Sequence, residues 1–186
     1  MMRQGFFSDG DMLHTCSFGA GKKGKVGMKQ HEYTAQFATW AVLASPIIIS
    51  ADLRSLQRTQ PACLNDLLKN SEILAVHQDA AANAPRVIFT RNATTAEDEH
   101  GALAVAVAAQ GFARKMADGS VALVLLNRKD SGSLTLSASW SELGLPAGSE
   151  CSVRDLINKK QLPKAKGSFS SAVPSHSASF VRVACG

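Results

Sequence analysis

The first half of the chain alternates between apolar residues at helical spacing and a short continuous apolar run. Between residues 29 and 44 the large apolar side chains recur every three or four positions, at Tyr33, Phe37, Trp40 and Ala44. This spacing predicts one buried face of a helix, and Pro46 ends the helix because proline is not tolerated in a helix interior. The run Pro-Ile-Ile-Ile-Ser at 46–50 is typical of a parallel strand that is covered on both faces.

A second helix is expected near residues 61–69. Its inward-facing residues are Leu64, Leu67 and Leu68, and Pro61 suits the first helical turn. The succession of helix, buried strand and helix indicates an α/β arrangement for this part of the chain.

The pattern changes after about residue 85, where short β-type runs follow one another with turn signals between them. The pair Asp118-Gly119 between two such runs predicts a hairpin. Several short strands without intervening helices favour an antiparallel sandwich. We therefore expect two units, an α/β unit at residues 1–84 and an all-β unit at residues 85–186.

Composition supports a packed protein and argues against several kinds of partner. The chain has 186 residues, of which 45% are hydrophobic, and a net charge of +5. Its lysines and arginines are scattered and only 6% of its residues are aromatic, so no basic groove with stacking aromatics for nucleic acid is expected. There is no apolar run of the length that a membrane helix needs, and the first residues show no apolar segment of a signal peptide.

The spacing of the cysteine and histidine residues predicts no metal site, and no cofactor is expected. Cys16, Cys63, Cys151 and Cys185 form no Cys-x-x-Cys pair, and the five histidines are dispersed. The sequence leaves the disulfide state of the four cysteines and the redox compartment open. The stretch Gly19 to Val26 nearly fits a phosphate-binding loop but has valine where a hydroxyl must hold magnesium. A solvated, lysine-rich loop is expected there.

The first chemically suggestive stretch is Asp9-Gly10-Asp11, close to Met12. On extended backbone two carboxylates at i and i+2 point to the same side. They would suit a cation site, a pair of acceptors for sugar hydroxyls, or simply a turn, and these residues alone do not decide among the three.

Longer segments around this stretch resemble a known family. In order along the chain they are DGDML, HEYTAQFATWAVLASPIIISADLRSL, SEILAVHQD, ADGSVALVLLNRKD, WSELGLPAGSECSVRDL and GSFSSAVPSH. Together they resemble the C-terminal portion of the α-galactosidase and α-N-acetylgalactosaminidase family, glycoside hydrolase family 27. That family carries Trp-Asn-Asp-Pro-Asp-Met-Leu at the place of the first segment. The resemblance covers almost the whole chain.

The resemblance implies a fold, α/β plus all-β: the end of a (β/α)8 TIM barrel followed by a C-terminal antiparallel β-sandwich. It implies retaining hydrolysis of terminal α-linked galactose, with Asp11 and Met12 binding the sugar. Asp9 would support them or hold a turn, and Asp52 would be structural, as a helix N-cap. No catalytic residue is expected in this chain, because the family's nucleophile and acid/base aspartates stand on earlier barrel strands. The chain is accordingly expected to begin inside a larger domain.

Some positions depart from the family pattern and leave the specificity open. Phe7 and Ser8 replace its Trp and Asn, Gly10 replaces its Pro, and His77 replaces an Asn. Galactose and N-acetylgalactosamine therefore both stay open as the sugar. Two further functions stay open beside the hydrolase: a non-catalytic carbohydrate-binding or interaction module, and an inactive relic.

The resemblance also implies a location and partners. It implies a secreted, vacuolar or lysosomal protein with an α-galactoside substrate, and a homodimer is one possible state of the full-length form. In such a compartment Asn92, which begins the triplet Asn-Ala-Thr, would be a glycosylation candidate.

Overall fold

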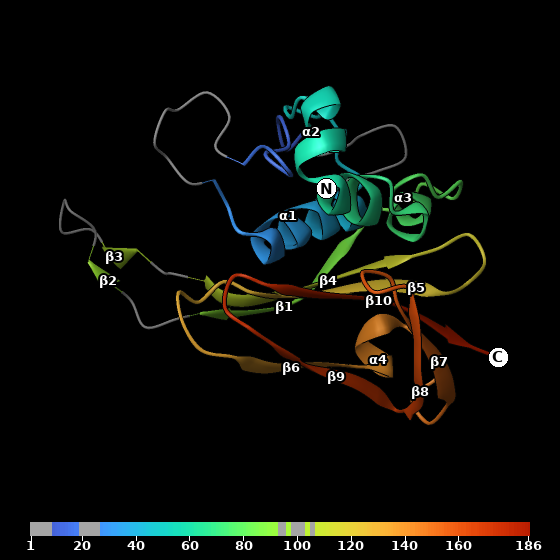
Figure 1. The fold of residues 1–186 in the computed structure, drawn as a ribbon. Helices are drawn as coiled ribbons and strands as arrows, with labels where there is room; N and C mark the ends of the chain where they lie inside the picture. The colour runs from blue at the N-terminus through green and yellow to red at the C-terminus, as the bar shows by residue number, and fades with distance from the viewer. Residues whose placement is uncertain (1–8, 19–26, 93–95, 98–102, 105–106) are drawn as a thin grey trace.

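A six-stranded antiparallel sheet separates two layers of the protein. The computed structural model describes residues 9–18, 27–92, 96–97, 103–104 and 107–186. In Figure 1, α1, α2 and α3 lie on one side of this sheet, and β6, β9 and α4 lie on the other. The helices are α1 (Gln30–Leu43), α2 (Leu53–Thr59), η1 (Cys63–Leu68), α3 (Ser71–His77) and α4 (Trp140–Leu143). The strands are β1 (Arg86–Asn92), β2 (Ala96–Glu97), β3 (Leu103–Ala104), β4 (Val107–Lys115), β5 (Val121–Asn127), β6 (Leu134–Ser139), β7 (Glu150–Asp155), β8 (Lys160–Lys166), β9 (Ser168–Val173) and β10 (Ala178–Cys185).

The first predicted helix is confirmed as α1. Tyr33 and Phe37 are fully buried, as the spacing required. The helix begins where the Glu32 carboxylate accepts a hydrogen bond of 2.6 Å from the Lys29 backbone amide. It ends at Ala44, whose backbone is left-handed with φ of 53°, two residues before the proline that was expected to stop it.

The segment after α1 contains more helix than the pattern predicted. The predicted helix near residues 61–69 is confirmed, with its three leucines buried, but over η1 its hydrogen bonds follow the wider π pattern. The start of α2 was expected only through the family resemblance, which made Asp52 a helix N-cap, and α3 was not predicted, because each of these helices has only seven residues and so shows little periodicity. Their N-caps, Asp52 and Asn70, are side chains that commonly begin helices.

The prediction of a strand covered on both faces at residues 46–50 was wrong. Among the described residues this run forms one parallel bridge, between Ile49 and Leu13. Ile48 is 47% exposed and Ile49 is 38% exposed. The run has the composition of a barrel strand, but a parallel strand is buried only where neighbours and helices cover it, and here Leu13 is the residue paired with it.

The antiparallel sandwich is confirmed, with the sheet order β1-β4-β5-β10-β7-β8 and a second pair β6-β9. Along β5, Ala122 and Val124 belong to the core beneath the helices, whereas Leu123 and Leu125 belong to the core facing β6 and β9. Burial on both faces explains the continuous apolar run in this strand. The predicted hairpin also forms, with Gly119 at φ of 85° between β4 and β5.

The strand β8 was missed because its sequence is rich in lysine and contains Pro163. Such a sequence is poor for a central strand, but β8 lies at the edge of the sheet. Proline and lysine are common on edge strands, where they discourage pairing with other chains.

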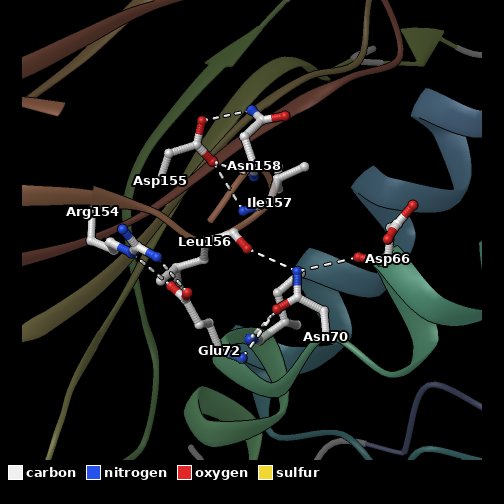
Figure 2. Close-up of polar contacts among 9 residues, drawn as sticks. Asp66, Asn70, Glu72, Arg154, Asp155, Leu156, Ile157 and Asn158 are labelled. Atoms are coloured by element: carbon white, nitrogen blue, oxygen red, sulfur yellow. Dashed lines mark hydrogen bonds and ion pairs between the residues drawn. The ribbon is translucent and has the colours of Figure 1, made fainter. Parts of the chain in front are cut away.

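Polar contacts join α3 to the end of β7, as Figure 2 shows. The side-chain Nδ2 of the fully buried Asn70 donates a hydrogen bond of 2.9 Å to the Leu156 carbonyl, while its side-chain Oδ1 accepts from the amides of Glu72 and Ile73. Glu72 in turn accepts two hydrogen bonds from Arg154. One residue thus both caps α3 and fastens it to the sandwich.

Arg114 on β4 holds the other end of α3. It is 2% exposed, and its guanidinium donates to the carbonyls of Val76 and Asn83, each at 2.9 Å. Burial lowers the pKa of Arg114, and the charge of nearby Asp79 opposes this effect. Arginine at a helix C-terminus satisfies carbonyls that have no partner within the helix.

The four cysteines, whose state the sequence left open, form two disulfides. Cys16 is bonded to Cys63, which ties the segment after Leu13 to η1. Cys151 is bonded to Cys185, and these two residues face each other across β7 and β10. Disulfides persist in oxidising compartments.

Candidate functional site

The segment with the two aspartates is a turn and not extended backbone. The Asp9 carboxylate accepts a hydrogen bond of 2.9 Å from the Asp11 amide, and the Asp11 carboxylate accepts one of 2.7 Å from the Met12 amide. Asp11 has a left-handed backbone with φ of 62°. Both carboxylates are exposed, and Met12 is 51% exposed. The two residues expected to bind sugar are thus neighbours on the surface, and Asp9 shapes the turn that presents them.

Gly10 allows this turn to lie directly on the ring of Trp40 from α1. A Cβ atom on Gly10 would lie 2.5 Å from Trp40 Cζ2, which is much closer than van der Waals contact. The Trp40 Nε1 group is buried without a hydrogen-bond partner among the described residues. The position where the family pattern has proline therefore has no room for a side chain here.

Beyond the turn, the chain pairs with the apolar run at 46–50 in parallel. The Leu13 amide donates to the Ile48 carbonyl at 2.8 Å, and the Ser50 amide donates to the Leu13 carbonyl at 3.3 Å. The Ser50 hydroxyl also donates to the Leu13 carbonyl. Because the two segments run in the same direction, the residues that follow them emerge at the same end.

A pocket of about 290 Å³ lies between the two segments that emerge there. One wall is the turn Cys16–Phe18, and the other is α2 with Asp52 before it. The residues that line it include Ser17, Phe18, Asp52, Ser55, Thr59 and Gln60. Of these residues, only Asp52 stood out from the sequence; the only signal of the others was their place just after the two paired segments.

Asp52 has the role of a helix cap. Its carboxylate accepts a hydrogen bond of 3.1 Å from the Arg54 amide. Desolvation acts to raise the pKa of Asp52, but the hydrogen bonds from the Arg54 and Ser55 amides and the Arg54 charge together keep that pKa below its ordinary value. Asp52 therefore lines the pocket as a carboxylate that is ionised at neutral pH.

A second pocket, of about 340 Å³, lies between α1, the end of α3 and β4. His77, where the family pattern has asparagine, donates from Nε2 to the Ser45 carbonyl at 2.8 Å. Asp79 accepts hydrogen bonds from the amides of Ala81 and Ala117, each at 3.1 Å. His77 thus ties the end of α3 to the segment after α1, and Asp79 ties the residues after α3 to the turn after β4. We therefore assign the polar groups of this pocket a structural role.

Other predicted features lie elsewhere or outside the described residues. Asn92 is exposed at the end of β1, but the next two residues of its triplet are outside the described part, as is the lysine-rich stretch at 19–26. Within the described ranges, no group of three potential ligands among His, Cys, Asp and Glu could hold a metal. No helix there is long and apolar enough to cross a membrane.

Two family models match the chain in consecutive order. One described as alpha galactosidase A matches residues 3–79, and one described as the alpha galactosidase C-terminal beta sandwich domain matches residues 99–183. The first range contains the aspartate turn and the 290 Å³ pocket, and the second contains most of the antiparallel sheet.

Curated proteins that are similar in sequence include alpha-galactosidases and an alpha-N-acetylgalactosaminidase. The chain is 28% identical over 172 residues to an alpha-galactosidase of Cyamopsis tetragonoloba, covering 92% of this chain and 35% of that protein. It is 31% identical over 153 residues to an alpha-galactosidase of Coffea arabica, covering 82% of this chain and 35% of that protein. An alpha-N-acetylgalactosaminidase of Rattus norvegicus is 29% identical over 145 residues, covering 78% of this chain and 29% of that protein. The chain thus spans about a third of the length of these relatives.

Solved structures show the same fold. Alpha-galactosidase I from Mortierella vinacea matches with a TM-score of 0.74 and 25% identity, over 95% of this chain and 39% of that one. A GH27 β-L-arabinopyranosidase from Geobacillus stearothermophilus matches with a TM-score of 0.75 and 20% identity, over 97% of this chain and 37% of that one. The similarity to the second supports the fold alone.

Proposed function

Because the chain belongs to the α-galactosidase and α-N-acetylgalactosaminidase family, glycoside hydrolase family 27, as its C-terminal portion, we propose that it completes a retaining α-galactosidase. In this proposal the protein removes terminal α-linked galactose from glycosides. The observation that carries it is the consecutive match to the alpha galactosidase A model and to the model of the alpha galactosidase C-terminal beta sandwich domain. The nucleophile and the acid/base come from barrel strands that are not in these 186 residues.

Asp11 and Met12 bind the galactose in this proposal. One oxygen of the Asp11 carboxylate accepts from the Met12 amide, and a carboxylate has further lone pairs for sugar hydroxyls. Hydrogen bonds to an ionised group are stronger than those between neutral groups. Met12 is half exposed beside it and offers an adaptable apolar surface to the C–H face of the sugar. The Asp9 hydrogen bond and the contact of Gly10 with Trp40 hold this pair in place.

The two disulfides favour a secreted, vacuolar or lysosomal location, because they persist outside the reducing cytosol. An α-galactoside is then the partner of the site, and no metal or cofactor takes part in the proposed reaction. A retaining glycosidase works with two carboxyl groups, one as nucleophile and one as acid/base.

The proposal is tested on the longest protein that contains this chain. That protein is isolated with an antibody against the sandwich and assayed with p-nitrophenyl α-galactoside and its N-acetylgalactosamine counterpart. We expect hydrolysis of the first with α-galactose as the initial product. The substitution Asp11→Asn should lower kcat/KM roughly 10- to 100-fold, the effect of weakening a charge-assisted hydrogen bond. Asp66→Asn, the same change at an exposed position on η1, should leave kcat/KM within about twofold.

The alternatives predict different outcomes. Binding of galactosides without hydrolysis of either substrate would favour a non-catalytic carbohydrate-binding module. Failure both to bind and to hydrolyse would favour an inactive relic. Preference for the N-acetylgalactosamine substrate would keep the mechanism and change the sugar assigned to the site.

A further inference from the structure

The 290 Å³ pocket occupies a place where a barrel enzyme binds its substrate. Its two walls follow Leu13 and Ile49, the residues that form the parallel bridge. In a (β/α)8 barrel the segments that follow the strands form the face that carries the active site. The pocket therefore opens on the catalytic side, yet it contains neither Asp11 nor Met12.

The wall that carries Phe18 is held in an unusual backbone shape. Cys16 and Phe18 both have left-handed backbones, with φ of 64° and 46°, a conformation that costs energy in residues other than glycine. The disulfide to Cys63 fixes the first, and the Tyr33 hydroxyl, which accepts a hydrogen bond of 2.7 Å from the Phe18 amide, fixes the second. Strained residues that the surroundings hold in place are frequent at binding sites.

This backbone places Phe18 in the wall of the pocket. Its ring meets the Tyr33 ring edge to face, with centroids 5.1 Å apart, and the residue remains 37% exposed. The opposite wall contains Ser55, Thr59 and Gln60, on α2 and at its end. The Thr59 hydroxyl donates to the Ser55 carbonyl at 3.0 Å and therefore offers the pocket an acceptor, whereas a serine hydroxyl and a glutamine amide can each donate or accept. An apolar ring opposite several neutral hydrogen-bonding groups suits a sugar, which has a C–H face and a rim of hydroxyls.

We propose that this pocket, the Phe18 pocket, binds a neutral sugar unit of an oligosaccharide substrate other than the terminal galactose. Phe18 would pack against the face of that unit, and Asp52, Ser55, Thr59 and Gln60 would bind its hydroxyls. Asp52 contributes an ionised acceptor in addition to its capping bond. The volume is just below the roughly 300 Å³ at which the usual range of small-molecule sites begins, so the pocket is sized for a single sugar unit and not for a longer ligand. This inference rests on the proposed glycosidase function and extends it to the recognition of longer substrates.

The test uses the chain itself and three defined sugars: methyl α-galactoside, sucrose and raffinose, which joins galactose to sucrose. Binding is followed through the backbone amide signals in nuclear magnetic resonance titrations. We expect sucrose and raffinose to shift the amide signals of Ser55, Thr59 and Gln60, and methyl α-galactoside to leave these signals unchanged. Raffinose titrations that leave all three amides in place would overturn the inference.

Two substitutions on opposite walls provide a second criterion. Phe18→Leu keeps an apolar contact with Tyr33 but removes the aromatic face, and Gln60→Ala changes only an exposed side chain. Each should raise the Kd for raffinose at least fivefold while the Kd for methyl α-galactoside stays within twofold. The control Val87→Ala removes a 58% exposed apolar side chain from β1 and should alter neither. A Kd for raffinose within twofold of the unsubstituted chain in both pocket variants would refute the proposed subsite.

Failure of this inference can be told apart from failure of the proposed function. Asp11→Asn should weaken methyl α-galactoside binding and leave the shifts that sucrose causes in the Phe18 pocket. If Asp11→Asn has no effect but Phe18→Leu weakens raffinose binding, the galactose assignment fails and the pocket stands. The reverse result removes the pocket and leaves the galactose assignment.

Discussion

Glu72 on α3 and Arg154 on β7 are joined by two hydrogen bonds, of 3.0 Å from Arg154 Nε and 2.7 Å from Arg154 Nη2 (Figure 2). The bond from Arg154 is the main cause that keeps the pKa of Glu72 below its ordinary value, against partial burial, which raises it. A carboxyl group with a lowered pKa in the folded state stabilises the fold while it is ionised. The attachment of α3 to the sandwich is therefore sensitive to acid.

Glu72→Gln should make the chain less stable at pH 7, and this loss should fade in acid. The contribution of Glu72 is complete above its unfolded pKa of about 4.3 and is lost as the pH falls through its lower folded value. Urea unfolding at pH 7, 5 and 3 measures the free energy of unfolding of both chains. The difference in this free energy between Glu72→Gln and the unsubstituted chain should disappear toward pH 3. Glu150→Gln, in a more exposed ion pair with Lys164 at 3.7 Å, is the control and should show a smaller difference at pH 7. A difference for Glu72→Gln that is equal at all three pH values would contradict this account.

Asn70→Ala should destabilise the chain by about 3 kcal/mol, because it removes the cap of α3 and leaves the buried Leu156 carbonyl without its donor. The matched substitution Asn65→Ala affects an exposed side chain on η1 whose hydrogen bond among the described residues comes from Lys69. It should cost less than about 0.5 kcal/mol. Urea unfolding monitored by circular dichroism measures both, and equal losses for the two variants would be inconsistent with a special role for Asn70.

Gly10→Ala should disturb the aspartate turn, because the added methyl group would lie 2.5 Å from the Trp40 ring. Overpacking of this kind costs about 1 to 3 kcal/mol and moves either the ring or the turn. We expect a shifted indole N–H signal from Trp40 and weaker binding of methyl α-galactoside. Gly148→Ala is the matched control, since no atom lies within 4 Å of the added carbon there. An unchanged Trp40 signal and unchanged binding in Gly10→Ala would show that the turn does not depend on this contact.

Removal of either disulfide should lower stability, but only one of the two should affect the Phe18 pocket. Loops closed over separations of 47 and 34 residues correspond to about 4 kcal/mol each in the chain-entropy relation. The double substitution of Cys16 and Cys63 by serine should also raise the Kd for raffinose, because it frees the turn that carries Phe18. The same change at Cys151 and Cys185 should leave that Kd within twofold, and a similar rise in both variants would point to general loosening of the fold.

The sequence by itself determined the elements whose local pattern agrees with their final surroundings. The helical spacing of Tyr33 and Phe37 predicted α1 because one face of that helix is buried and the other is not. The apolar run in β5 indicated a strand because β5 is buried on both faces. The pair Asp118-Gly119 predicted the hairpin because Gly119 has the left-handed backbone that such a turn requires. The order of longer motifs indicated the family, which the comparisons then supported.

Only the tertiary structure decided the features that depend on distant parts of the chain. The run at 46–50 has the composition of a buried strand, yet Ile48 and Ile49 are exposed because burial depends on neighbouring strands and not on composition. The lysine-rich β8 is a strand because it lies at the edge of the sheet. The pairing of Cys16 with Cys63, the contact of Gly10 with Trp40 and the walls of the Phe18 pocket join residues that are 30 to 47 positions apart. No local pattern records such contacts, because they form only when the packed helices and strands bring those residues together.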